Sequence, residues 1–122
     1  MDYLQRIVDT DLQMLIDKLP LGIKDSLAQR DDNSELLEVI LDLGREPEAR
    51  YLSESCLLSD HEVVDSDIQY VVKRIGSFGG DNRAGIERTL HRISALRSRN
   101  ANIVGLTLRV GRAVYGTIRI IG

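Results

Sequence analysis

Residues 103–111 read Ile-Val-Gly-Leu-Thr-Leu-Arg-Val-Gly, and apolar side chains take every second position from Val104 onward. An extended chain places alternate residues on opposite faces, so the stretch predicts a strand with one apolar and one polar face. Arg109 falls on the polar face by this count. The apolar positions are Val104, Leu106, Leu108 and Val110.

The residues just before this strand supply a neighbour for it. Residues 97–102 read Arg-Ser-Arg-Asn-Ala-Asn, which is typical of a turn, so we predict a long hairpin of residues 88–98 and 103–111. An alternative remains open, because residues 86–97 also carry apolar side chains at helical spacing. These are Ile86, Leu90, Ile93 and Leu96.

The N-terminal third predicts helices. Apolar residues at spacings of three and four indicate an amphipathic helix over about residues 2–18, and Pro20 ends it or opens a short second helix. Ile23 and Leu27 continue the same period, and residues 29–34 form a polar loop. The apolar positions of the first helix are Leu4, Ile7, Val8, Leu12, Leu15, Ile16 and Leu19.

Strands are predicted to follow. Residues 36–43 (LLEVILDL) favour a largely buried strand, residues 44–47 a turn, and residues 49–52 and 56–58 two shorter strands. A further helix is expected after them, with Ser66 as its N-cap, Gln69 completing a capping box, and Gly76 at its end. Residues 77–85 (SFGGDNRAG) read as a glycine-rich loop.

Composition limits the class of protein. The chain has 122 residues, 43% hydrophobic and 29% charged, which suits one globular domain rather than a disordered chain. It contains no run of 18 apolar residues, so we expect no membrane insertion. The order of elements predicts an α+β fold: an antiparallel sheet with two N-terminal helices and one further helix. The single cysteine, Cys56, fits a reducing compartment.

Charge is divided unevenly along the chain. Residues 1–61 carry 6 basic and 14 acidic side chains, whereas residues 62–122 carry 10 basic and 5 acidic ones. Residues 82–122 hold eight arginines, no lysine and one acid. Guanidinium groups match phosphate and carboxylate geometry, so this stretch is either a solvated basic surface or an anion site.

Few residues suggest chemistry within the chain itself. The loop Gly79-Gly80-Asp81-Asn82-Arg83-Ala84-Gly85 lacks the GxxxxGK[ST] pattern of a P-loop, so it favours a turn that needs glycine. His91 is expected to be a packing or surface residue. No nucleophile elbow and no ordinary zinc-ligand spacing occurs, so we expect neither catalysis nor a resident cofactor or metal in this chain.

The runs LLEVILDLGREPEAR and GGDNRAGIERTLHRISALRSRNANIVGLTLRVGRAVYG resemble the N-terminal region of a P-loop ATPase family of cyanobacteria and algal plastids. That family is related to the stage III sporulation AA protein and, distantly, to secretion and pilus-retraction ATPases. The resemblance covers residues 36–122. The apolar periodicity predicts a helical segment at 1–30. The resemblance implies a PAS-like domain at 36–119 and, from 120–122, a linker to a motor domain that this chain lacks. The resemblance implies that the chain is a fragment of a longer ATPase, and the alternative is a stand-alone paralogue.

The resemblance also implies a site. In the distant relatives, arginines of this domain approach the phosphates of nucleotide held by the motor domain, in a ring-shaped hexamer. The runs Arg92-Ile93-Ser94-Ala95-Leu96 and Leu108-Arg109-Val110 match the hairpin strands concerned. ATP and Mg would belong to the parent protein, and its own motor domain and neighbouring subunits would be the partners. The implied phosphate contacts are Arg109, Arg112, Arg92 and Arg97.

Two other functions fit the same residues. The basic hairpin would suit a nucleic-acid backbone, although stacking modules also need aromatic side chains, which this segment nearly lacks. The acidic N-terminal half would suit a pure interaction domain that docks on a basic neighbour. The expected location is bacterial cytoplasm or plastid stroma.

Overall fold

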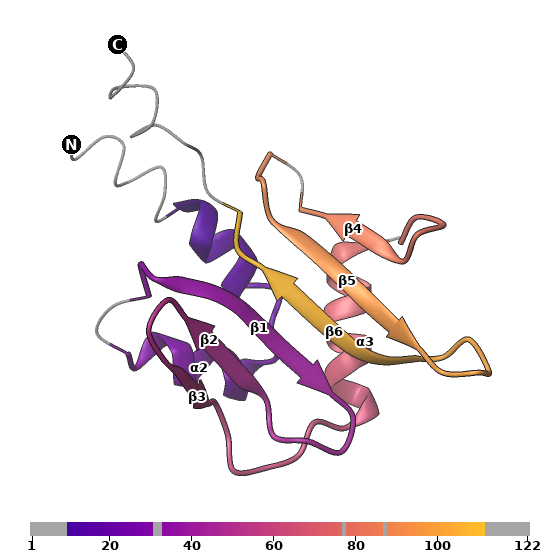
Figure 1. The fold of residues 1–122 in the computed structure, drawn as a ribbon, viewed down its shortest axis with the longest axis horizontal. Helices are drawn as coiled ribbons and strands as arrows, with labels where there is room; N and C mark the ends of the chain where they lie inside the picture. The colour runs from indigo at the N-terminus through magenta and orange to yellow at the C-terminus, as the bar shows by residue number, and fades with distance from the viewer. Residues whose placement is uncertain (1–9, 31–32, 77, 87, 112–122) are drawn as a thin grey trace.

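The computed structural model describes residues 10–30, 33–76, 78–86 and 88–111, which form helices packed on one antiparallel sheet (Figure 1). Residues 10–16 are helical, and α2 (Leu21–Ala28) and α3 (Asp65–Ile75) follow along the chain. The expected α+β fold is confirmed. The strands are β1 (Leu36–Asp42), β2 (Glu48–Tyr51), β3 (Ser55–Leu57), β4 (Arg83–Gly85), β5 (Arg92–Arg97) and β6 (Ile103–Arg109).

The strand order is β3-β2-β1-β6-β5-β4, with every neighbouring pair antiparallel. The first and last strands of the described part, β1 and β6, therefore meet at the centre of the sheet, where Val39 lies opposite Leu108. The hairpin of β5 and β6 confirms the predicted one, and the helical alternative for residues 86–97 is wrong. Residues 92–97 pair with β6 along their whole length, which a helix could not do, although β5 begins at Arg92 rather than at residue 88.

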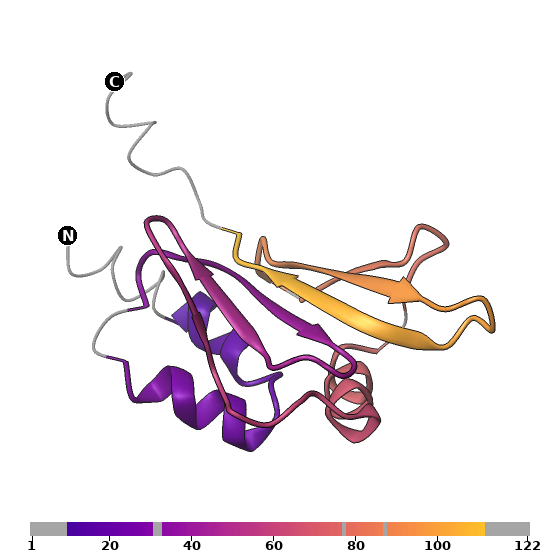
Figure 2. The ribbon, with the colours of Figure 1, turned by 60° about the horizontal axis from the view of Figure 1, so that its bottom comes forward.

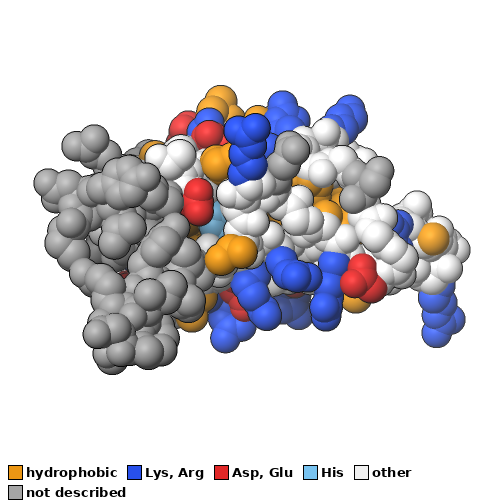
Figure 3. Space-filling model, turned by 90° about the horizontal axis from the view of Figure 1, so that it is seen from above, with side chains coloured by type: hydrophobic (Ala, Val, Ile, Leu, Met, Phe, Trp, Pro, Cys, Tyr) orange, Lys and Arg blue, Asp and Glu red, His pale blue; other side chains and the backbone are white. Residues whose placement is uncertain are grey.

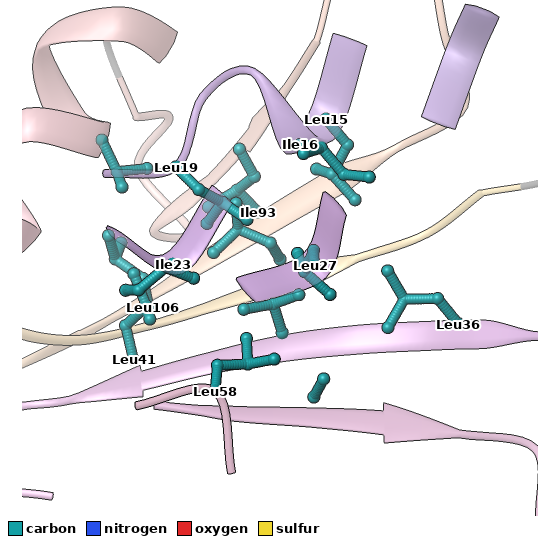
Figure 4. Packing of buried hydrophobic residues seen from close by; sticks show 14 of the residues in the cluster. Leu15, Ile16, Leu19, Ile23, Leu27, Leu36, Leu41, Leu58, Ile93 and Leu106 are labelled. Atoms are coloured by element: carbon teal, nitrogen blue, oxygen red, sulfur yellow. The ribbon is translucent and has the colours of Figure 1, made fainter. Parts of the chain in front are cut away.

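All the helices lie on one face of the sheet (Figure 2). Apolar side chains from residues 10–16 and α2 point onto the inner positions of β1, β5 and β6 (Figure 4). Leu15, Leu27, Leu41, Ile93 and Leu108 are all fully buried. Because side chains alternate along each strand, burying one face leaves the other set exposed to solvent. No helix of the described part is long and apolar enough to cross a membrane.

Two local expectations need correction. α3 begins two residues earlier than predicted, and Ser66 and Gln69 do not form its cap. Instead, the backbone N–H of Val64 donates to the Asp67 carboxylate at 3.0 Å. The Asp67 carboxylate, in the first turn of α3, satisfies the Val64 N–H in place of the predicted Gln69 side chain. Its negative charge also complements the helix dipole. Gly76 ends the helix as expected, with a positive φ of 84°.

The second correction concerns the glycine-rich loop. Its last three residues form β4, which pairs with β5 through Arg83 opposite Ser94 and Gly85 opposite Arg92. A three-residue strand has no periodicity that a sequence pattern can detect. The turn between β5 and β6 lies where expected, and Ala101 within it takes the left-handed conformation, with φ at 65°.

Candidate anion-binding face

The outer face of the sheet, opposite the helices, carries four charged side chains in one line across four strands. Arg50 of β2 lies opposite Glu38 of β1, Glu38 opposite Arg109 of β6, and Arg109 opposite Arg92 of β5. We call these four residues the arginine row. Figure 1 looks onto this face, with the helices behind it. Residues distant in sequence are therefore neighbours on one surface.

The three arginines of the arginine row are exposed, and their alternate neighbours in the strands are buried. Leu108 is fully buried, whereas 73% of the Arg109 side chain is exposed. Arg92 is exposed too, and Ile93 beside it is buried. Seen from above, a group of Lys and Arg side chains lies along the lower margin of the molecule, and others lie along the upper margin (Figure 3). The polar-face position predicted for Arg109 is confirmed.

Arg92 and Arg109 form an unusual pair. Directly opposed residues on one sheet face have Cβ atoms about 5 Å apart, and like charges in such a pair are destabilising. Among the described residues, Arg92 has no ion pair, and Arg109 only approaches Glu38, with Nη2 4.0 Å from Oε2. The pair is thus incompletely neutralised within the described chain. A bound anion would supply the missing charge.

Glu38 is the acidic member of the row. Its side chain is only 13% exposed, and its carboxylate accepts a hydrogen bond from Arg50 Nη1 at 3.3 Å. Glu38 and Arg50 are the site residues that sequence reasoning missed. The alternation of β1 places Glu38 on the polar face, but only the pairing of β1 with β6 brings it beside Arg109.

A hollow of about 370 Å³ lies beside the row, at the β4 edge of the sheet. Arg83 and Arg92 both line it, and these two are diagonal neighbours across the β4–β5 pair. Gly85 stands directly opposite Arg92, so no side chain fills the surface there. The hollow therefore adjoins Arg92, one member of the exposed arginine pair. Its other lining residues are Asp81, Ala84, Thr89, Leu90 and His91.

The remaining loop candidates have structural contacts. The Gly79 N–H donates to the Arg83 carbonyl at 2.9 Å, and the Asn82 N–H donates to the Gly79 carbonyl at 2.9 Å. Asn82 has a φ of 61°. Neither Gly79, Gly80 nor Asn82 lines the hollow. This loop satisfies its own backbone, as expected of a turn.

Arg97 lies away from the arginine row. Its Nε donates to Asn82 Oδ1 at 2.6 Å and its Nη1 to the Ala101 carbonyl at 2.8 Å. The first bond joins the end of the hairpin to the loop before β4, and the second stays within the turn between β5 and β6. Arg112, the fourth predicted phosphate contact, lies outside the described residues.

His91 is a packing residue, as expected. It is 2% exposed, and its Nδ1 accepts the Gly111 N–H at 2.9 Å. The ring proton must then sit on Nε2, which faces the Asp11 carbonyl at 2.6 Å. A side chain at Gly111 would collide with the Leu90 carbonyl. His91 thus ties the first helix to the end of β6.

Nothing in the described ranges points to a metal site, since no group of three potential ligands comes together there. The pKa of Asp17 is lowered, first by the hydrogen bond from Gln13 Nε2 and then by Lys24 at 3.1 Å. Asp17 lies in the helical layer, so this shift belongs to the helices rather than to the arginine row.

No protein-family model matches the chain. It is 50% identical over 115 residues to the uncharacterized protein ycf45 of Porphyra purpurea, covering 94% of this chain and 20% of that protein. It is 42% identical over 111 residues to SEEDLING PLASTID DEVELOPMENT 1 of Arabidopsis thaliana, covering 91% and 16%. A ycf45 of Cyanidium caldarium is 37% identical over 110 residues, covering 90% and 33%.

These similarities identify ycf45 and SEEDLING PLASTID DEVELOPMENT 1 as homologues of the chain. The chain spans between 16% and 33% of the length of these relatives. Among solved structures, the ATPase DotB of Legionella pneumophila has a TM-score of 0.42 and 8% identity, covering 65% of this chain and 25% of DotB. The expected relation to the stage III sporulation AA protein stays a prediction.

Proposed function

We propose that the chain is the PAS-like accessory domain of a ring-forming P-loop ATPase, and that Arg109 and Arg92 contact the phosphates of nucleotide bound by the motor domain. The observation that carries the proposal is the pair itself: two exposed arginines placed directly opposite each other, without a full complement of negative charge nearby. Two like charges placed opposite each other lower the stability of the sheet, and a bound anion would offset this repulsion.

The motor domain would supply the chemistry. This chain has no GxxxxGK[ST] pattern, so ATP and Mg would be held elsewhere in a longer protein. Curated relatives three to six times longer than the aligned region leave room for such a domain. The role of this chain's own residues is to present guanidinium groups to the phosphates, with Arg92 and Arg109 foremost and Arg83 beside them. Movement of the face toward the motor would then couple nucleotide state to shape.

Partners and location follow from the same proposal. The motor domain and neighbouring subunits of a homo-hexamer would meet this domain, and the acidic N-terminal half would face a basic surface of the next subunit. Relatives from red algae and a plant, one of them named for plastid development, support plastid stroma or cyanobacterial cytoplasm as the location.

The test uses ATP hydrolysis by the full-length gene product. Arg109→Ala is expected to slow hydrolysis by at least about tenfold, as for other groups that stabilise transition-state charge. Arg99→Ala is the matched control, because Arg99 is an exposed arginine in the turn between β5 and β6. Unchanged turnover in Arg109→Ala would remove the arginine pair from the mechanism. So would an equal loss in both variants.

A nucleic-acid backbone is the second candidate ligand, because Arg83, Arg92 and Arg109 share one open surface. It is the weaker candidate, since the paired positions of the outer face carry no aromatic side chain among the described residues. Fluorescence anisotropy with short RNA and DNA at two salt concentrations decides it. Backbone binding would give a log–log salt slope of about −0.9 for each duplex phosphate contacted.

A further inference from the structure

Glu38 lies between Arg50 and Arg109 in the arginine row, where its carboxylate competes with any anion that binds Arg109. Its side chain is 13% exposed and lies at the centre of the sheet, and its carboxylate accepts a hydrogen bond from Arg50 Nη1 at 3.3 Å. Arg109 Nη2 stands 4.0 Å from the other carboxylate oxygen, which is too long for a hydrogen bond. The carboxylate therefore keeps Arg50 as its hydrogen-bond partner, whereas the Arg109 side chain is 73% exposed and its guanidinium can turn toward another anion.

The two ends of the row differ in charge as a result. At the β2 end, Arg50 and Glu38 form a hydrogen-bonded ion pair. At the β5 end, Arg92 and Arg109 leave an excess of positive charge beside the hollow that Arg83 and Arg92 line. An anion that approaches Arg109 meets attraction from the two arginines and repulsion from Glu38 at the same time.

We propose that Glu38 is a built-in competing anion that makes this face selective for a polyphosphate chain over a single phosphate. The inference rests on the proposed function, because it assumes that Arg109 and Arg92 bind phosphate. A monophosphate reaches Arg109 only against the nearby carboxylate. A di- or triphosphate spans Arg109, Arg92 and Arg83 together and gains enough contacts to outweigh the repulsion. Glu38 thereby sets both the affinity and the preferred ligand.

The test compares two isosteric substitutions in this 122-residue chain. Glu38→Gln removes the competing charge and keeps an oxygen that can accept the Arg50 hydrogen bond. Glu48→Gln removes the same charge from the same sheet face, one row away, where Glu48 lies opposite Ile40. Binding of inorganic pyrophosphate and of orthophosphate is measured by NMR titration, with the amide signals of Arg92 and Arg109 as the probe.

We expect Glu38→Gln to bind pyrophosphate about three- to tenfold more tightly than the unmodified chain, because one like charge near the ligand is gone. Orthophosphate should gain by a larger factor, so that the preference for pyrophosphate shrinks. Glu48→Gln should change either affinity less than about twofold, because the charge it removes lies farther from Arg109. Arg109→Gln should remove the gain that Glu38→Gln brings.

Weaker or unchanged binding in Glu38→Gln overturns the inference, and so does an equal gain in Glu48→Gln. The absence of a pyrophosphate response in both the unmodified chain and Glu38→Gln overturns it too. Each of these failures is separate from failure of the proposed function, which is decided by hydrolysis in Arg109→Ala. If that variant hydrolyses ATP slowly while Glu38→Gln binds no better, the arginines keep their role and Glu38 loses its own.

Discussion

The two faces of the central sheet are made by alternate residues of the same strands, yet one face is apolar and buried and the other is charged and exposed. On the inner face of β6, Leu106 and Leu108 are buried against the helical layer. On the outer face, Arg109 is exposed and stands opposite another arginine. Burial stabilises the inner set, whereas like-charge opposition works against stability in the outer set. The contrast teaches that folding explains the inner face, whereas the proposed anion ligand would explain the outer one.

The largest effect should come from the inner face. Leu108→Ala is expected to lower the free energy of unfolding by about 3 kcal/mol, because it removes a fully buried side chain from the centre of the core. Arg109→Gln, one residue along the same strand, should change it by no more than about 0.5 kcal/mol. Chemical denaturation measures both. Similar losses in the two variants would mean that the two faces do not differ as described.

An intermediate effect is expected where a polar group lies within the buried layer. His91→Ala should cost about 2 kcal/mol, since it leaves the Gly111 N–H and the Asp11 carbonyl without their partner. His61→Ala is the control, because 89% of the His61 side chain is exposed. Thermal and chemical unfolding of the two variants gives the comparison. Equal stability would show that His91 does not join the first helix to the end of β6.

The smallest effect should have the opposite sign. Arg92→Thr is expected to stabilise the chain by about 0.3 kcal/mol, because it relieves the Arg92–Arg109 repulsion and adds a residue that favours strands. Arg50→Thr should instead destabilise slightly, since Arg50 has Glu38 as a partner. Repeating both measurements in high salt should shrink the difference. A stability loss in Arg92→Thr would mean that the arginine pair is not strained.

Much of the fold could be predicted from sequence because burial leaves a periodic trace. The alternation in residues 103–111 and the apolar run in residues 36–43 place β6 and β1 correctly, to within one or two residues at their ends. β4 and the start of α3 were beyond this reasoning. A three-residue strand carries no period, and a cap depends on which of several nearby carboxylates reaches the free N–H.

The candidate site was predictable in part. Arg109 could be placed on the polar face by counting, and Arg92 came from the resemblance to ATPase hairpins. Glu38 and Arg50 could not be found, because their nearness to Arg109 depends on pairing between strands more than fifty residues apart. Arg97 was predicted as a phosphate contact from the resemblance, but its guanidinium donates hydrogen bonds to Asn82 and to the Ala101 carbonyl.

By itself, the sequence determined which residues alternate, which segments bury an apolar side, and that its basic charge gathers in the last third. Those properties are local, since they follow from backbone periodicity and from the cost of exposing apolar groups. Tertiary structure alone decided that β1 lies beside β6, and so that one carboxylate stands among three arginines on an open face. Strand order and register depend on the whole core, and no short stretch of residues encodes them.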